Sequence, residues 1–132
     1  MIRRSEPFQV PSSGRSIRIT LASGADDTTG IFVIDDLNLF IKQPGKEPVS
    51  VWGNPGFDKG AQMESPAGVP ENWLRGGSAP TIARVAKTSS GISLALVDGD
   101  QAASGIWTRT QLLPKIPPDG ETMLLTWSEM FN

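Results

Sequence analysis

Two stretches near the end of the chain carry side chains that could recognise a sugar. In one alternating segment, Trp107, Arg109 and Gln111 share one parity and therefore one face of a strand. In the final apolar segment, Trp127 and Glu129 share a face in the same way. Aromatic rings stack on the C–H faces of sugars, and a few well-placed polar groups bind the hydroxyls. We expect the five residues to line one concave sheet if the two strands are neighbours.

The same tryptophans also have a purely structural interpretation. Trp127 lies between Leu125 and Phe131, which favours a place in the core. Trp107 stands beside Arg109 and is compatible with either exposure or burial. The chain has no Tyr, which removes a common sugar-stacking residue. The exposure of Trp107 and its neighbours therefore distinguishes a sugar-binding face from a structural set of tryptophans.

Composition excludes several kinds of chemistry. The chain has 132 residues, the size of one domain, and a net charge of 12 − 14 = −2. Its basic residues form no patch or stripe in the sequence, so we expect no nucleic-acid partner. Without Cys or His there are no disulfides, no imidazole catalysis and no zinc site with such ligands. Two acids could hydrolyse a glycosidic bond, but no two acids are placed in one cleft, so we expect no enzyme.

The elements that must position these residues are strands. No segment keeps an apolar helical face free of Gly or Pro, and these two residue types number 14 and 11. In segment 15–21, Ile17, Ile19 and Leu21 alternate, and Gly30–Ile41 is the strongest strand of the chain. We expect an all-β fold, a two-sheet antiparallel sandwich of about eight strands. Further strands are expected at 49–52, 81–85, 92–97, 105–113 and 121–131.

No segment has the sequence of a membrane span or of a signal peptide. No apolar run approaches the roughly 20 residues that a spanning helix needs. The first residues, Met1-Ile-Arg-Arg-Ser-Glu6, contain no apolar core of a signal peptide. We therefore expect no membrane insertion and no signal peptide in this chain.

Several motifs together resemble jelly-roll carbohydrate-binding modules of the type grouped in families 4, 9, 16 and 22. Asn54-Pro-Gly-Phe-Asp58, Pro70-Glu-Asn-Trp73 and Gly120-Glu-Thr-Met-Leu-Leu-Thr-Trp127 are similar to the opening half of such modules. Phe8-Gln-Val-Pro11 and Gly30-Ile-Phe-Val-Ile-Asp-Asp-Leu-Asn-Leu39 are similar to their closing half. The resemblance implies a single jelly-roll domain over 1–132 whose halves stand in inverted order, with closing strands in 1–47 and opening strands in 48–132.

The inverted order has two explanations. The chain is either a circular permutant that folds alone through residues 42–53, or part of a domain-swapped homo-oligomer in which a second chain completes each sandwich. The middle strands of the family are short or missing here, and a half-built sheet has unpaired edges. The sequence leaves both explanations open.

The resemblance also implies a structural Ca²⁺ site. Modules of this type often hold calcium between the opening Phe-Asp/Glu segment and the closing Asp, which correspond here to Asp58 and to Asp36 or Asp35. Ca²⁺ takes 6–8 oxygen ligands, which loop carbonyls of 56–59 could complete. The alternative is that one Asp faces solvent and the other pairs with a backbone N–H or an Arg.

Two functions follow as expectations. The first is a non-catalytic module that binds a polysaccharide or oligosaccharide through a concave sheet, outside the cell or at its surface, as part of a longer exported protein. The second is a structural or adhesive β-sandwich that binds no sugar and mediates protein assembly at the cell surface.

Overall fold

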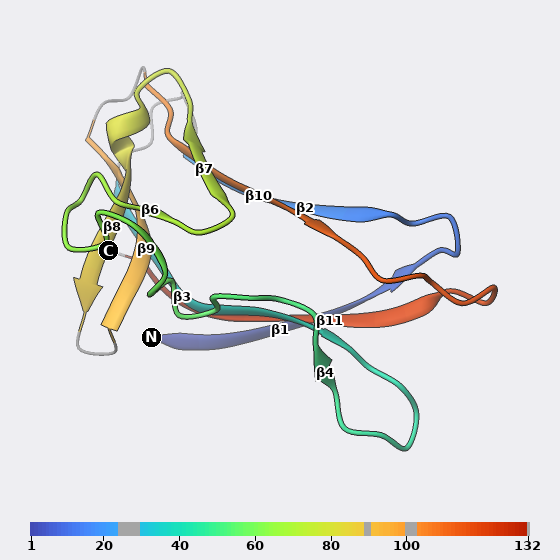
Figure 1. Ribbon diagram of the computed structural model, residues 1–132. Helices are drawn as coiled ribbons and strands as arrows, with labels where there is room; N and C mark the ends of the chain where they lie inside the picture. The colour runs from blue at the N-terminus through green and yellow to red at the C-terminus, as the bar shows by residue number, and fades with distance from the viewer. Residues whose placement is uncertain (24–29, 89–90, 100–102, 132) are drawn as a thin grey trace.

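The structure, a computed structural model, describes residues 1–23, 30–88, 91–99 and 103–131. It confirms the all-β antiparallel sandwich: two sheets pack face to face (Figure 1). Sheet A has the order β1 (Ile2–Val10), β11 (Glu121–Phe131), β3 (Gly30–Ile41), β9 (Gly91–Asp98) and β8 (Ala83–Thr88), with β4 (Val49–Ser50) added against β3. Sheet B has the order β2 (Ser16–Ala22), β10 (Ile106–Leu112) and β7 (Trp73–Gly76). A small ribbon joins β5 (Gly60–Ala61) and β6 (Val69–Pro70), and a 3₁₀ turn covers Pro80–Ile82.

Alternation of side chains along the strands explains how the sheets pack. On β2 the inward side chains are Ile17, Ile19 and Leu21, as expected, and they pack against the core. On β3 the inward-facing Ile34 and Leu39 are 3% and 0% exposed. Each sheet therefore buries one apolar face against the other, which is the main source of stability in a sandwich.

The first 41 residues pair with the second part of their own chain. β1 runs antiparallel to β11 with Val10 opposite Glu121, and β2 runs antiparallel to β10 with Ile19 opposite Arg109. β3 lies between β11 and β9 in the middle of sheet A. The strands assigned to the closing half are thus inserted among those assigned to the opening half.

A β-bulge interrupts the pairing of β11 with β3. The register shifts between Thr126 and Ser128, and on β3 Asp36 takes a left-handed conformation with φ of 50°. Asp tolerates this conformation better than most residues because its short side chain can bond locally. The backbone N–H of Asp36 donates a hydrogen bond to Oδ1 of Asp35 at 2.7 Å. The bulge falls at the Asp-Asp pair of the strongest predicted strand.

The Gly- and Pro-rich segment between β4 and β7 packs against the core. Its Phe57 is 0% exposed and meets the Trp73 ring edge-on at a centroid distance of 5.9 Å. A Cβ atom on Gly60, where φ is 148°, would lie 2.2 Å from the carbonyl oxygen of Val69, so only glycine fits there. The strand expected at 49–52 is shorter than predicted and ends at Ser50, because Trp52 turns inward and is 6% exposed. Among the described residues, no helix is long and apolar enough to cross a membrane.

Candidate functional site

The five residues predicted to bind sugar are divided between the two sheets. β10, which carries Trp107, Arg109 and Gln111, pairs with β2 and β7. β11, which carries Trp127 and Glu129, pairs with β1 and β3. The condition on which the five residues would line one concave sheet, that the two strands are neighbours, is therefore not met. Residues 113–120 lead from one sheet to the other, so adjacency in sequence does not become adjacency in a sheet (Figure 1).

Trp107 belongs to the core. It is 0% exposed, and its indole N–H donates a hydrogen bond to the carbonyl oxygen of Ala95 at 3.2 Å. The guanidinium of Arg75 lies 4.6 Å from the centre of the Trp107 ring. A buried tryptophan with a satisfied N–H cannot stack on a sugar from solvent. Of the two interpretations left open by the sequence, the structure supports the core one for this residue.

Arg109 and Gln111 face inward as well. Arg109 is 1% exposed, donates to the carbonyl oxygen of Gly53 at 2.7 Å and to Oε1 of Gln111 at 3.0 Å, and lies 3.5 Å over the ring of Trp52. Burial lowers the pKa of Arg109 to about 10, although the charge of Glu71 acts in the opposite direction. The sequence left the exposure of Trp107 and Arg109 open, and in the structure stacking on Trp52 and two hydrogen bonds compensate the burial of Arg109.

The inner face of sheet A becomes more exposed towards the start of β1. Along this strand the inward side chains go from Val10, 7% exposed, through the half-buried Phe8 to the exposed Glu6 and Arg4 and to Ile2, 59% exposed. In Figure 1 the two sheets diverge towards the N-terminal end of β1. The inner face of sheet A is therefore exposed where β1 begins and β11 ends.

Six residues form this uncovered surface, which we name the open face. Arg4 lies directly opposite Trp127, and its Nε atom is 2.7 Å from Oε1 of Glu129. Residues paired directly across an antiparallel ladder point to the same side of the sheet. The open face consists of Ile2, Arg4, Phe32, Trp127, Glu129 and Phe131.

The aromatic residues of the open face differ in exposure. Trp127 is partly exposed and still packs against the core. Phe131 is 74% exposed and its ring centre lies 4.6 Å from that of Phe32. Phe131 has the parity of Trp127 and Glu129, so the alternation along one strand could have identified it. Arg4 could not be identified in this way, because only the register of β1 against β11 brings it there.

The two segments expected to hold calcium lie side by side. The N–H of Leu37 donates to the carbonyl oxygen of Pro55 at 3.1 Å, which places the segment 54–58 against Asp35 and Asp36. Asp58 is exposed, and its carboxylate lies next to Gly56, where an added Cβ would be 3.5 Å from Oδ2.

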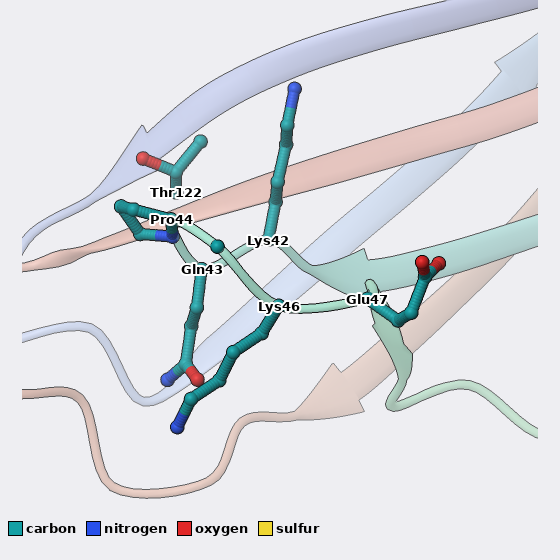
Figure 2. A pocket seen from close by; sticks show the side chains of 7 residues that line it. Lys42, Gln43, Pro44, Lys46, Glu47 and Thr122 are labelled. Carbon is teal, nitrogen blue, oxygen red and sulfur yellow. The ribbon is translucent and has the colours of Figure 1, made fainter.

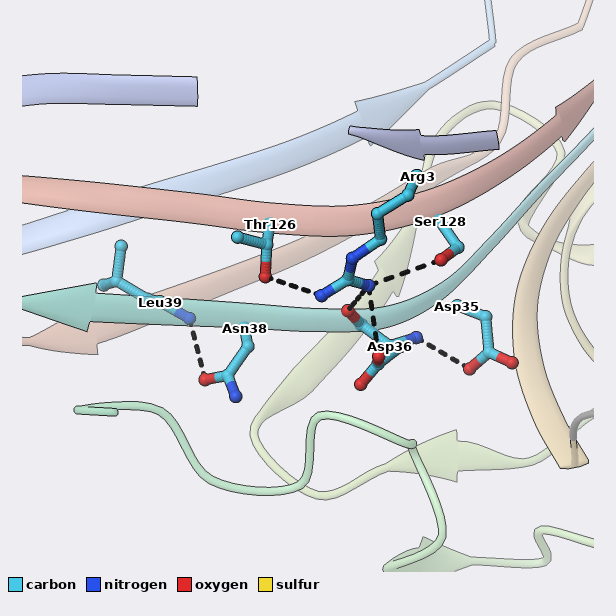
Figure 3. A network of polar contacts seen from close by, with 7 residues as sticks. All are labelled: Arg3, Asp35, Asp36, Asn38, Leu39, Thr126 and Ser128. Atoms are coloured by element: carbon cyan, nitrogen blue, oxygen red, sulfur yellow. Dashed lines mark hydrogen bonds and ion pairs between the residues drawn. The ribbon is translucent and has the colours of Figure 1, made fainter. Parts of the chain in front are cut away.

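The carboxylate of Asp36 has a partner other than a metal. Figure 3 shows the Arg3 guanidinium between β1, β11 and β3, where Nη1 is 3.1 Å from Oδ2 of Asp36 and Nη2 donates to Oγ1 of Thr126 at 3.0 Å. Nη1 also donates to Oγ of Ser128 and to the carbonyl oxygen of Asp36. In the part of the chain that the structure describes, no three Asp, Glu, His or Cys side chains form a group that could hold a metal ion. The side chains as they stand do not fit the predicted site, and calcium binding stays a prediction.

A polar groove lies at the other end of β1 and β11. Figure 2 shows its first pocket, about 480 Å³, bounded by the loop that follows β3 and by Thr122 of β11. A second pocket of about 510 Å³ shares Lys42 and Lys46 with it and extends to Gln9 and Asp119. The groove is open, carries charges of both signs and contains no aromatic ring. It lacks the stacking surface that most sugar sites use.

Comparison with protein-family models, with curated proteins and with solved structures finds no match to this chain.

Proposed function

We propose that the chain is a non-catalytic glycan-binding module that uses the open face of sheet A. One observation supports this most directly: Trp127 is partly exposed and stands beside the ion pair of Arg4 and Glu129 on the open face of sheet A. An aromatic ring offers the apolar surface on which a sugar stacks, while a guanidinium and a carboxylate bind hydroxyls from two directions.

The buried tryptophans limit this proposal to one strand pair. Trp107, Trp73 and Trp52 are 0%, 2% and 6% exposed and cannot contribute stacking surface. The site that remains is short, since it spans only the first residues of β1 and the last of β11. We therefore expect weak binding of a few sugar units rather than tight binding of a long chain.

Binding to a glycan array and affinity electrophoresis in soluble polysaccharides test the proposal. We expect retardation of the unaltered chain by at least one polysaccharide, and its loss in Trp127→Ala. Because Trp127 also packs on the core, Glu129→Gln and Phe131→Ala serve as milder variants that should weaken binding while the fold persists. Leu112→Ala, on the outer side of β10 where Leu112 is 77% exposed, is the matched control and should bind normally. No binding to any glycan would contradict the proposal.

A second function is favoured by the apolar part of the same region. Ile2 and Phe131 are 59% and 74% exposed near the ends of two neighbouring strands. Exposed apolar side chains that gather in one place often mark contacts between proteins. Under this alternative the chain is a structural or adhesive sandwich. Sedimentation should then show reversible association that Phe131→Ser abolishes, with no glycan bound.

A further inference from the structure

Three buried N–H groups in the interior of the sandwich have no acceptor. Within the described residues, these are Nε1 of Trp52, Nε1 of Trp73 and Nε of Arg109. The three residues are 6%, 2% and 1% exposed. A buried donor without a partner costs about 1–3 kcal/mol, so native proteins contain few of them. Three in one protein of this size need an explanation.

The three donors belong to one cluster. The Arg109 guanidinium lies 3.5 Å from the centre of the Trp52 ring. The rings of Trp52 and Trp73 meet edge-on with centroids 6.2 Å apart. Arg109 and Trp73 lie directly opposite each other on β10 and β7, so they share the inner face of sheet B. We name this group the Trp52–Trp73–Arg109 cluster.

Within the described residues the Arg109 guanidinium forms no direct ion pair, although the charge of Glu71 acts on it at longer range. The two ion pairs among the described residues are formed by Arg3 and by Arg4, and Arg109 takes part in neither of them. Its two hydrogen bonds go to the neutral oxygens of Gly53 and Gln111. A buried charge normally has a partner of opposite charge, because removing it from water is costly. The three donors need a hydrogen-bond acceptor, and the positive charge of Arg109 favours an acceptor that carries negative charge.

The two residues that accept hydrogen bonds from Arg109 are accessible to solvent. Gly53, whose carbonyl oxygen accepts the bond from Arg109, is exposed, and a Cβ atom added to it would meet nothing within 4 Å. Gln111, which accepts the second bond, is also partly exposed. The cluster therefore lies directly beneath the surface at Gly53 and Gln111.

We propose that the Trp52–Trp73–Arg109 cluster binds a small oxyanion, supplied either as a free inorganic anion or as the carboxylate of an acidic sugar. Oxyanion oxygens accept charge-assisted hydrogen bonds, which are roughly twice as strong as neutral ones. The indole N–H groups of Trp52 and Trp73 donate and cannot accept, so an oxygen acceptor suits all three groups. The site is separate from the open face, because Arg109 and Trp73 lie on sheet B and Trp52 follows β4, whereas the open face belongs to β1, β3 and β11.

Nuclear magnetic resonance of the tryptophan indole groups tests this proposal in the intact chain. With four tryptophans, a ¹⁵N-labelled sample gives four indole N–H signals. Sodium sulfate and sodium glucuronate are titrated separately, with sodium chloride at matched ionic strength as the reference. We expect saturable shifts of the Trp52 and Trp73 signals. The Trp107 signal should stay in place, because its N–H already donates to Ala95.

The two anions separate the sources. A response to glucuronate alone identifies an acidic sugar as the ligand, a response to sulfate alone identifies an inorganic anion, and a response to both supports a general oxyanion site. Equal shifts in chloride, shifts of all four signals together, or no shift in either anion would overturn the proposal. The Trp127 signal reports on the open face, so failure of the glycan proposal is seen separately.

Substitutions provide the second readout. Arg109→Met should abolish the response to anions. If that variant fails to fold, Trp52→Phe keeps an aromatic ring at this position but removes the N–H donor, and should weaken the anion affinity at least fivefold. Trp107→Phe removes a donor that is already satisfied and is the matched control, whose anion affinity should stay unchanged. An unchanged anion affinity in Trp52→Phe, or a normal response in a folded Arg109→Met variant, would contradict the site.

Discussion

At the scale of single residues, two arginines lie among the apolar side chains on the inner face of sheet B. Arg75 and Arg109 both stack on tryptophans, and burial lowers the pKa of both. Arg75 uses all three nitrogens of its guanidinium to donate to backbone carbonyls. These acceptors are the carbonyl oxygens of Pro66, Ala67, Gly68 and Ala83. One side chain thus fixes an irregular loop to the edge of β8.

Replacing Arg75 tests this role. Arg75→Met should lower the free energy of unfolding by about 2–3 kcal/mol, because hydrogen bonds to charged groups contribute about 1.5–3 kcal/mol and several carbonyls lose their donor. The measurement is unfolding in urea. Arg84→Met is the control, since Arg84 is exposed and bonds only the carbonyl oxygen of Thr81, and it should change stability by less than about 0.5 kcal/mol. Equal losses in both variants would contradict the role of Arg75.

At the scale of elements, β1 is an edge strand with features that discourage further pairing. Its outer side faces no other strand in sheet A. Glu6 and Arg4 are charged residues on its inward face, and Pro7 lacks a backbone N–H. Charges that point inward and prolines are two common ways of protecting a sheet edge from pairing with another chain.

Removing this protection should promote association. Glu6→Val combined with Pro7→Val gives β1 a continuous apolar and hydrogen-bonding edge. We expect the double variant to form dimers or aggregates at micromolar concentration, which sedimentation velocity would detect. Gln9→Val, on the same strand, is the control and should stay in the state of the unaltered chain. A double variant with unchanged sedimentation would show that the edge is protected by other means.

The calcium site expected at the bulge between β11 and β3 can be tested by removing metal ions. Arg3 supplies the positive charge at Asp36, so we expect EDTA to leave the melting temperature unchanged. A ligand that binds only the native state raises its stability, and its removal must lower the melting temperature. A fall in EDTA that added Ca²⁺ reverses would therefore support the calcium site expected from Asp35, Asp36 and Asp58.

At the scale of the whole molecule, the order of the strands in space differs from their order in the chain. β3 lies in the middle of sheet A, between β11 and β9. The first three strands are therefore held by the last three, and their pairing closes the sandwich. The same strand pairing can form within one chain, as in this structure, or between two copies of the chain that exchange their first strands.

A pair of cysteines distinguishes these two possibilities. Gln9 and Thr122 lie directly opposite on β1 and β11, and their side chains are hydrogen-bonded at 2.6 Å. The chain has no cysteine of its own. Opposite residues of an antiparallel pair are close enough for a disulfide. The double variant Gln9→Cys with Thr122→Cys, oxidised at low concentration, should run as a monomer in a denaturing gel without reductant. A covalent dimer would indicate a swapped oligomer.

The sequence by itself determined the strands and the direction of their side chains. Period-two alternation indicates which residues of one strand share a face, so Ile17, Ile19 and Leu21, and likewise Trp127 and Glu129, were grouped correctly. The strong strand at Gly30–Ile41 was found with its bounds, because apolar residues on both parities suit a central strand.

Only the tertiary structure decided which strands are neighbours and which face is inside. Alternation is the same whether a face is buried or exposed, so it could not tell that Trp107 and Arg109 point into the sandwich. Nor could it show that β10 and β11 lie in different sheets, since that depends on the path of residues 113–120. The open face and the Trp52–Trp73–Arg109 cluster both join residues far apart in the chain. They exist because non-local pairing brings those residues together.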